Sequence, residues 1–193
     1  MNRFKLFLLT IVSASLLSSC GYNSMVSGRE NVEQKWGNVE SQYQRRADLV
    51  PNLVKVVQQY ADYEQETLTQ VIEARSKAKS ITVDPKNLTE ADMQRFMQVQ
   101  TSLGSAIDVL VERYPDLKAN QNFIELQAQL ESTENRISVA RMDYNEAARA
   151  YNTKIKKFPQ LLYSGMFGFK EKPYFQGQEG SDQAPDVDSY FDN

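Results

Sequence analysis

The 193-residue chain contains no histidine and a single cysteine, Cys20. The lack of histidine removes the commonest metal ligand and the commonest general base near neutral pH. Zinc hydrolases and Ser-His-Asp enzymes are therefore excluded. If Cys20 is modified as argued below, no thiol remains for a disulfide, a thiolate metal site or a cysteine nucleophile. The composition predicts a protein that is not an enzyme, and no motif indicates a cofactor or a metal ion.

The chain also lacks a surplus of positive charge. It has 22 Lys and Arg residues against 25 Asp and Glu residues, a formal net charge of −3. Arg3 and Lys5 belong to the export signal described below, whereas residues 177–193 are acidic and contain no Lys or Arg. Without these two ends the body is formally neutral. Such a body has little electrostatic attraction for a phosphate backbone, so we expect no nucleic-acid partner.

Proline is scarce in the middle of the chain, where Pro51, Pro85 and Pro115 are the only ones between residues 21 and 158. Between these prolines the apolar residues recur at the spacing of amphipathic helices. Short links between long amphipathic helices favour antiparallel neighbours. The sequence therefore predicts an all-α fold, an elongated antiparallel four-helix bundle with coiled-coil-like seams. The predicted seams contain Met25, Val32, Trp36, Val39 and Tyr43; Leu53, Val57, Tyr60, Leu68 and Val71; Met93, Phe96, Leu103, Ile107, Leu110 and Tyr114; and Phe123, Leu130, Ile137, Tyr144, Tyr151 and Phe158.

The predicted breaks between the helices lie at the prolines. Residues 48–51 are interpreted as a turn, with Pro51 in the first turn of the second helix, where its missing N–H costs nothing. Residues 84–87 are interpreted as a connector, and Tyr114-Pro115 as the end of the third helix, because a residue before proline avoids the α region. An alternative stays open, in which three helices form and the first two are one rod kinked near Pro51.

Two capping pairs are predicted at helix starts. Thr89 with Asp92 three residues later, and Asn122 with Glu125, both have the spacing at which a side chain caps the first turn of a helix. A helix from Asn122 to Phe158 would be about 55 Å long. We therefore expect a rod rather than a globe, a shape that suits a spacer or docking post better than an enclosed active site.

Residues 1–19 have the three parts of an export signal. Arg3 and Lys5 are cationic, Leu6 to Leu17 form an apolar run, and Leu17-Ser18-Ser19-Cys20 closes the segment. A lipid-transferring enzyme needs a thiol to alkylate, small residues before it, and a branched apolar residue three positions upstream. The run is shorter than the roughly 20 residues that span a hydrocarbon core, which favours a cleaved signal. The alternative is a signal anchor with an incidental cysteine.

Cys20 is thus the predicted lipid attachment site of a bacterial lipoprotein. Several acyl chains such as palmitate, at about 0.8 kcal/mol per buried CH2, would anchor it stably. We expect residues 1–19 to be the signal peptide, residues 20–169 the helical bundle and residues 170–193 an acidic, disordered tail. The apolar segment 161–169 is expected to fold back over the open end of the bundle, or else to form a patch for a partner or a membrane surface.

Four charged residues fall on the apolar seams, namely Arg46, Glu64, Glu134 and Arg141. A charge in a seam must be paired, or it costs several kcal/mol. We therefore predict a buried ionic layer that sets the register of the helices. Two alternatives stay open, a polar pocket that binds a ligand or moves protons, and charges that are simply solvated. Tyr144-Asn145 and Tyr151-Asn152 repeat seven residues apart, which is typical of core tyrosines.

The motifs of the mature chain, taken in order, resemble the LemA family over nearly its whole length. They are Tyr22-Asn23, Arg45-Arg46-Ala47-Asp48-Leu49-Val50-Pro51-Asn52-Leu53-Val54, Tyr60-Ala61, Glu64, Ala74-Arg75, Tyr114-Pro115-Asp116-Leu117-Lys118-Ala119-Asn120, Phe123, Leu126-Gln127, Glu134, Ile137, Arg141, Tyr144-Asn145, Tyr151-Asn152 and Phe158-Pro159.

The resemblance implies a membrane-tethered helical bundle outside the cytoplasm, with no established catalytic activity or substrate. Members are often encoded near membrane-bound proteases, which suggests protein partners in a membrane protease system. The chain departs from the family pattern at its start, because it has a lipobox where many members keep a transmembrane helix. Residue 21 is Gly rather than Asp, so the inner-membrane retention signal of enteric bacteria is absent.

Two functions are therefore expected. The first is a membrane-anchored interaction or scaffold protein of the bacterial cell envelope, which fits the lipid anchor, the rod and the neutral body. The alternative is a ligand-binding or catalytic bundle that uses the charged seam residues, and it predicts a polar cavity lined by Glu64, Glu134 and Arg141.

Overall fold

The computed structural model describes residues 2–59 and 65–176, with side chains placed from Gly21 onward except at residues 65, 116 and 118. These residues form four α-helices and two short 3-10 helices, without a strand in the described ranges. The all-α prediction is confirmed. The elements are α1 (Asn2–Gln58), α2 (Gln65–Ser80), α3 (Glu90–Arg113), η1 (Pro115–Ala119), α4 (Gln121–Lys156) and η2 (Gln160–Leu162).

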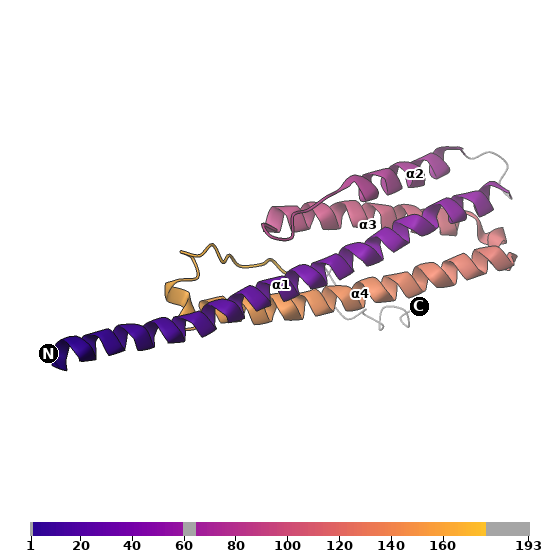
Figure 1. Cartoon of the computed structure of the whole chain (residues 1–193). Helices are drawn as coiled ribbons and strands as arrows, with labels where there is room; N and C mark the ends of the chain where they lie inside the picture. The colour runs from indigo at the N-terminus through magenta and orange to yellow at the C-terminus, as the bar shows by residue number, and fades with distance from the viewer. Residues whose placement is uncertain (1, 60–64, 177–193) are drawn as a thin grey trace, which may run out of the picture.

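The helices pack as two pairs. α1 lies along α4, α2 lies along α3, and α1 also contacts both helices of the second pair (Figure 1). With its 36 residues α4 is about 54 Å long. The first turns of α1 project beyond the end of the bundle (Figure 1). Within the described residues, no helix combines the length and the apolar composition needed to cross a membrane.

The turn predicted at residues 48–51 is wrong, because α1 continues through Pro51 to Gln58. Proline in a helix interior leaves the carbonyl four residues earlier without its N–H donor. That carbonyl belongs to Ala47, and it accepts a hydrogen bond of 2.8 Å from Nε of Arg75 on α2. A side chain from another helix thus replaces the missing donor. The three-helix alternative had the rod through Pro51 right, but α2 is a separate helix.

Replacing Arg75 with alanine should lower the free energy of unfolding by about 1–3 kcal/mol, since it leaves the buried Ala47 carbonyl without a partner. Pro51→Ala restores a backbone N–H at the position that bonds this carbonyl in a regular helix. The cost of Arg75→Ala should therefore shrink in the Pro51→Ala background. Urea unfolding of the four chains of this double-mutant cycle measures the difference.

Arg149→Ala is the matched control for Arg75→Ala, because Arg149 is an arginine exposed on α4. Its replacement should change the free energy of unfolding by less than about 0.5 kcal/mol. An equal cost of Arg75→Ala with and without Pro51 would contradict the assigned role of the guanidinium.

The other helix ends follow the sequence more closely. Thr89 caps α3 through a full capping box with Asp92, as predicted. α3 ends at Arg113, directly before Tyr114 and Pro115. The predicted cap at Asn122 is wrong, because Asn120 follows η1 in an extended conformation and its Oδ1 accepts a hydrogen bond of 3.1 Å from Phe123 N.

The buried core has two parts that follow each other along the rod. Both consist largely of the apolar residues of the predicted seams. Among the described residues the seams are confirmed except at Tyr114, which is only partly buried, and at Phe158, which lies beyond the end of α4 and is exposed. Tyr60 lies outside the described residues. The first part contains Trp36, Tyr43, Met93, Phe96, Ile137, Tyr144, Tyr151 and Phe175. The second part contains Val50, Leu53, Val57, Val71, Leu103, Ile107, Leu110 and Phe123.

After α4 the chain turns back onto the bundle. Residues 169–176, here called the strap, contribute the buried side chains of Phe169, Lys172 and Phe175 (Figure 1). Residues 170–176 were predicted to belong to an acidic tail, but they are part of the folded body. Burial of apolar side chains explains the difference, since Phe175 packs in the first part of the core. Residues 177–193, the remainder of the predicted tail, lie outside the described residues.

Candidate functional site

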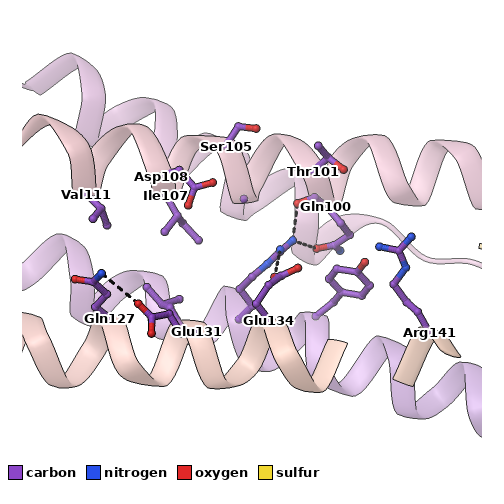
Figure 2. Close-up of a pocket in the computed structure, with 14 residues that line it drawn as sticks. Gln100, Thr101, Ser105, Ile107, Asp108, Val111, Gln127, Glu131, Glu134 and Arg141 are labelled. Atoms are coloured by element: carbon purple, nitrogen blue, oxygen red, sulfur yellow. Dashed lines mark hydrogen bonds and ion pairs between the residues drawn. The ribbon is translucent and has the colours of Figure 1, made fainter. Parts of the chain in front are cut away.

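A groove of about 380 Å³ lies between α3 and α4, beside Tyr43 and Arg46 of α1 (Figure 2). Three of the four predicted charged seam residues line it, namely Arg46, Glu134 and Arg141. Its lining is mixed, with two arginines, three carboxylates, amides and a few apolar side chains. The polar and charged residues that line it are Tyr43, Arg46, Gln100, Thr101, Ser105, Asp108, Gln127, Glu131, Glu134 and Arg141.

Arg46 and Gln100 together connect all four helices at this point. Nη1 of Arg46 donates to Oε2 of Glu134 on α4 at 3.0 Å, and its Nη2 donates to the Gln100 carbonyl of α3 at 2.5 Å. Gln100 is buried too, and its Nε2 donates to the Ala78 carbonyl of α2 at 3.3 Å. The guanidinium lies 5.0 Å from the centroid of the Tyr43 ring. A buried arginine needs such partners, because an unpaired buried charge is costly.

The structure differs from the predicted buried layer because the carboxylate that pairs with Arg46 is exposed. The Arg46 side chain is 8% exposed, whereas that of Glu134 is 59% exposed. Water screens an ion pair with one exposed partner, so the hydrogen bonds to Gln100 are the more important contacts of Arg46. The pair thus lies at the edge of the groove and not inside the seam.

The other two members of the predicted layer do not join this pair. Arg141 lines the groove, but its Nη2 donates to the Gln176 carbonyl at 2.9 Å and its guanidinium lies 5.1 Å from the Phe175 ring centroid. Arg141 therefore contacts the strap. Glu64 lies outside the described residues.

Burial changes the electrostatics of the groove. Burial raises the pKa of Tyr43, and it raises the pKa of Asp108, where the nearby Glu112 adds to the effect. Nε of Arg46 is buried without a hydrogen-bond partner. The groove thus offers several polar atoms to a small polar molecule, whereas Nε of Arg46 is shielded from solvent. Within the described residues no group of three or more acidic, histidine or cysteine side chains is arranged to hold a metal ion.

Sequence reasoning missed the two asparagines that hold the strap. Lys172 N donates to Oδ1 of Asn152 at 2.9 Å, and Nδ2 of Asn152 donates to the Lys172 carbonyl at 2.8 Å. Asn145 makes the same pair of bonds with Phe175, at 2.8 and 2.9 Å. The repeated Tyr-Asn dipeptide is the available signal, since its spacing of seven residues places both asparagines along one side of α4. The tyrosines of the repeat are buried as predicted, and the Tyr144 hydroxyl donates to the Pro173 carbonyl at 3.1 Å.

Cys20, the predicted lipid attachment site, is a residue of α1, and its side chain is not among those that the structure describes. Of the segment expected to cover the end of the bundle, Phe169 is buried and Tyr163 packs partly against the core. Its other large apolar side chains are exposed. Part of this segment thus folds back onto the bundle as predicted, and the rest is exposed; its role as a patch for a partner or a membrane surface stays a prediction.

The sequence model of the LemA family matches residues 35–189. The chain belongs to the LemA family. The matched region of this LemA-family chain includes Arg46, the groove, Asn145, Asn152 and the strap, and it begins after Cys20. The resemblance based on the motifs is therefore confirmed.

Individual relatives agree with this assignment. Magnetosome protein MamQ 2 of Paramagnetospirillum magneticum is 26% identical over 183 residues, covering 83% of this LemA-family chain and 66% of that protein. Protein LemA of Metamycoplasma hominis is 25% identical over 136 residues, covering 70% of this chain and 60% of that protein. The chain thus spans no more than about two thirds of the length of these curated relatives.

Proposed function

We propose that this LemA-family protein is a lipoprotein of the bacterial cell envelope, anchored through Cys20, whose bundle acts outside the cytoplasm as a non-enzymatic interaction or scaffold protein. The observation that carries the proposal is Leu17-Ser18-Ser19-Cys20 at the end of a short cationic and apolar segment. The match to the family supports the helical body.

The form of the body supports an interaction role. The four helices make an elongated rod with long exposed faces, and α4 alone is about 54 Å long. Its protein partners are to be sought in membrane protease systems, as the resemblance to the LemA family implies. The acyl chains would hold the rod at the membrane, where such partners are embedded.

The intact mass of the protein purified from membranes tests the anchor. We expect a chain that begins at Cys20 and carries two or three acyl chains, because the lipobox directs both acylation and cleavage. Cys20→Ala should keep residues 1–19 and carry no acyl mass. Ser18→Ala is the matched control, since it keeps a small residue before the thiol and should be processed normally. A native chain that retains Met1 and has no added mass would refute the anchor.

A second candidate function is the binding of a small polar ligand in the groove between α3 and α4. The observation that favours it is the groove of about 380 Å³ with two arginines, three carboxylates and several other polar side chains in its lining. It ranks second because Nη1 and Nη2 of Arg46 already bond Glu134 and Gln100.

A further inference from the structure

The loop after α4 exposes a concentration of apolar side chains. Its five large apolar residues are between 55% and 79% exposed: Phe158, Leu161, Leu162, Met166 and Phe167. Other exposed apolar residues of the described chain, such as Val109 on α3 and Val139 on α4, are scattered along the helices, which is normal for a protein surface. Clustered exposure within ten residues instead marks a contact surface. Residues 158–167 are called the end loop below.

The end loop is held in a defined shape. Ser164 N donates to the Gln160 carbonyl at 2.8 Å, and Phe169 N donates to the Ser164 carbonyl at 3.0 Å. The ring of Tyr22 on α1 makes edge contacts with Phe167 and Phe169, with centroids 5.3 and 5.6 Å apart. The loop is thus fixed to α1 while its apolar side chains remain exposed.

The same contacts place the end loop beside the proposed lipid attachment site. The hydroxyl of Tyr163 lies so close to the Cα of Gly21 that a Cβ at residue 21 would overlap with it. Gly21 is the neighbour of Cys20 in the chain. η2 contacts α1 at the end of the bundle from which the first turns of α1 project (Figure 1). Acyl chains on Cys20 would therefore enter the membrane next to the exposed apolar side chains.

The charges near the end loop are mostly positive, although the body as a whole is neutral. Residues 154–172 contain five lysines and one acidic residue, Glu171, which pairs with Lys156 at 2.6 Å. Lys157 and Lys170, which flank the loop, are exposed. Apolar side chains flanked by lysines are typical of segments that lie in the interface of a bilayer with anionic headgroups.

We propose that the end loop is a membrane-docking element, which inserts its apolar side chains into the leaflet that holds the acyl chains of Cys20 while its flanking lysines contact anionic headgroups. This proposal rests on the proposed lipid anchor. With two attachments at one end, the rod stands on the membrane instead of swinging from a single residue. The groove and α2 are then held away from the lipid surface, where a partner can reach them.

Depth-dependent quenching tests the end loop. The full chain carries an environment-sensitive NBD label at Leu162→Cys or Met166→Cys and is reconstituted into vesicles of phosphatidylethanolamine and phosphatidylglycerol containing spin-labelled lipid. Acylation blocks the thiol of Cys20, and intact mass of the same sample reports whether it is acylated. Met142→Cys is the matched control, because this side chain is 61% exposed on α4, about 21 Å before the end of the helix.

We expect strong quenching and a blue shift at Leu162 and Met166, and neither at Met142. Quenching should weaken in vesicles of phosphatidylcholine alone, which lack anionic headgroups. Unquenched loop labels on a chain with acylated Cys20 overturn the docking loop and leave the lipid anchor intact. On a chain with unmodified Cys20, where loop and control variants carry the same second label, quenching of the loop variants beyond that of Met142→Cys supports the loop and refutes the anchor. A blue shift seen only in native membranes would assign the loop to a protein partner and overturn the proposal.

Discussion

Trp36→Ala is expected to lower the free energy of unfolding by about 3–5 kcal/mol. Trp36 is 1% exposed and is among the largest fully buried side chains described. Its ring lies 5.1 Å from that of Phe96 on α3, 5.6 Å from that of Tyr144 on α4, and stacks on Phe175 of the strap at 5.7 Å. Four parts of the fold meet at this indole, so no single neighbour can move to fill the cavity.

Urea unfolding of the chain from Gly21, followed by circular dichroism, measures this loss, since the variant has no tryptophan left for fluorescence. Trp36→Phe should cost less, because an aromatic ring remains to face Phe96 and Tyr144. Val139→Ala is the control for an exposed site and should stay within about 0.5 kcal/mol. A loss below about 1 kcal/mol for Trp36→Ala would mean that the strap and the helices do not depend on this contact.

Helical spacing predicted the core well because burial depends on local periodicity. Residues at positions such as Val32, Val39 and Ile137 need only the right spacing to share a face, and they are buried. The helix ends were harder to predict. α1 passes through Pro51, and Arg75, which follows Ala47 by 28 residues, replaces the lost donor at the Ala47 carbonyl. No property of the residues around Pro51 reveals a partner that distant.

The candidate site was predicted in part for the same reason. Arg46 and Glu134 both fall on seams, so the sequence placed both in one predicted layer, and the ion pair of 3.0 Å joins them. The exposure of Glu134 follows from the space between α3 and α4, which no heptad pattern encodes. The contact of Arg141 with Gln176 depends on the strap returning along α4, and its composition resembled that of a solvated tail.

The end loop and the strap follow each other in the chain, separated only by Gly168. Nζ of Lys172 in the strap donates to the carbonyls of Pro85 and Lys86 in the connector before α3. Burial lowers the pKa of Lys172. The chain after α4 thus ties the end of the bundle near Gly21 to both helix pairs. If the end loop docks on a membrane, the strap is the part that transmits its position to α3.

The double substitution Asn145→Ala, Asn152→Ala is expected to release the strap from the bundle. The two amides make four hydrogen bonds to the backbone of Lys172 and Phe175, each contributing about 0.5–1.5 kcal/mol. Their loss should lower the free energy of unfolding by about 3 kcal/mol, because Phe175 then leaves its place against Trp36 as well. Hydrogen exchange should show rapid exchange of the amides of residues 170–176, while α1 and α4 stay protected.

The matched control is Asn135→Ala, because Asn135 is an asparagine exposed on the same helix. The conservative variant Asn152→Asp distinguishes the two hydrogen bonds that the Asn152 side chain makes with the backbone of Lys172. A carboxylate can still accept from Lys172 N, but it cannot donate to the Lys172 carbonyl and repels it. Asn152→Asp should therefore be no more stable than Asn152→Ala. If residues 170–176 kept their protection in the double alanine variant, the buried ring of Phe175 and the bonds of Lys172 alone would hold the strap, and the Tyr-Asn repeat would have no part in placing it.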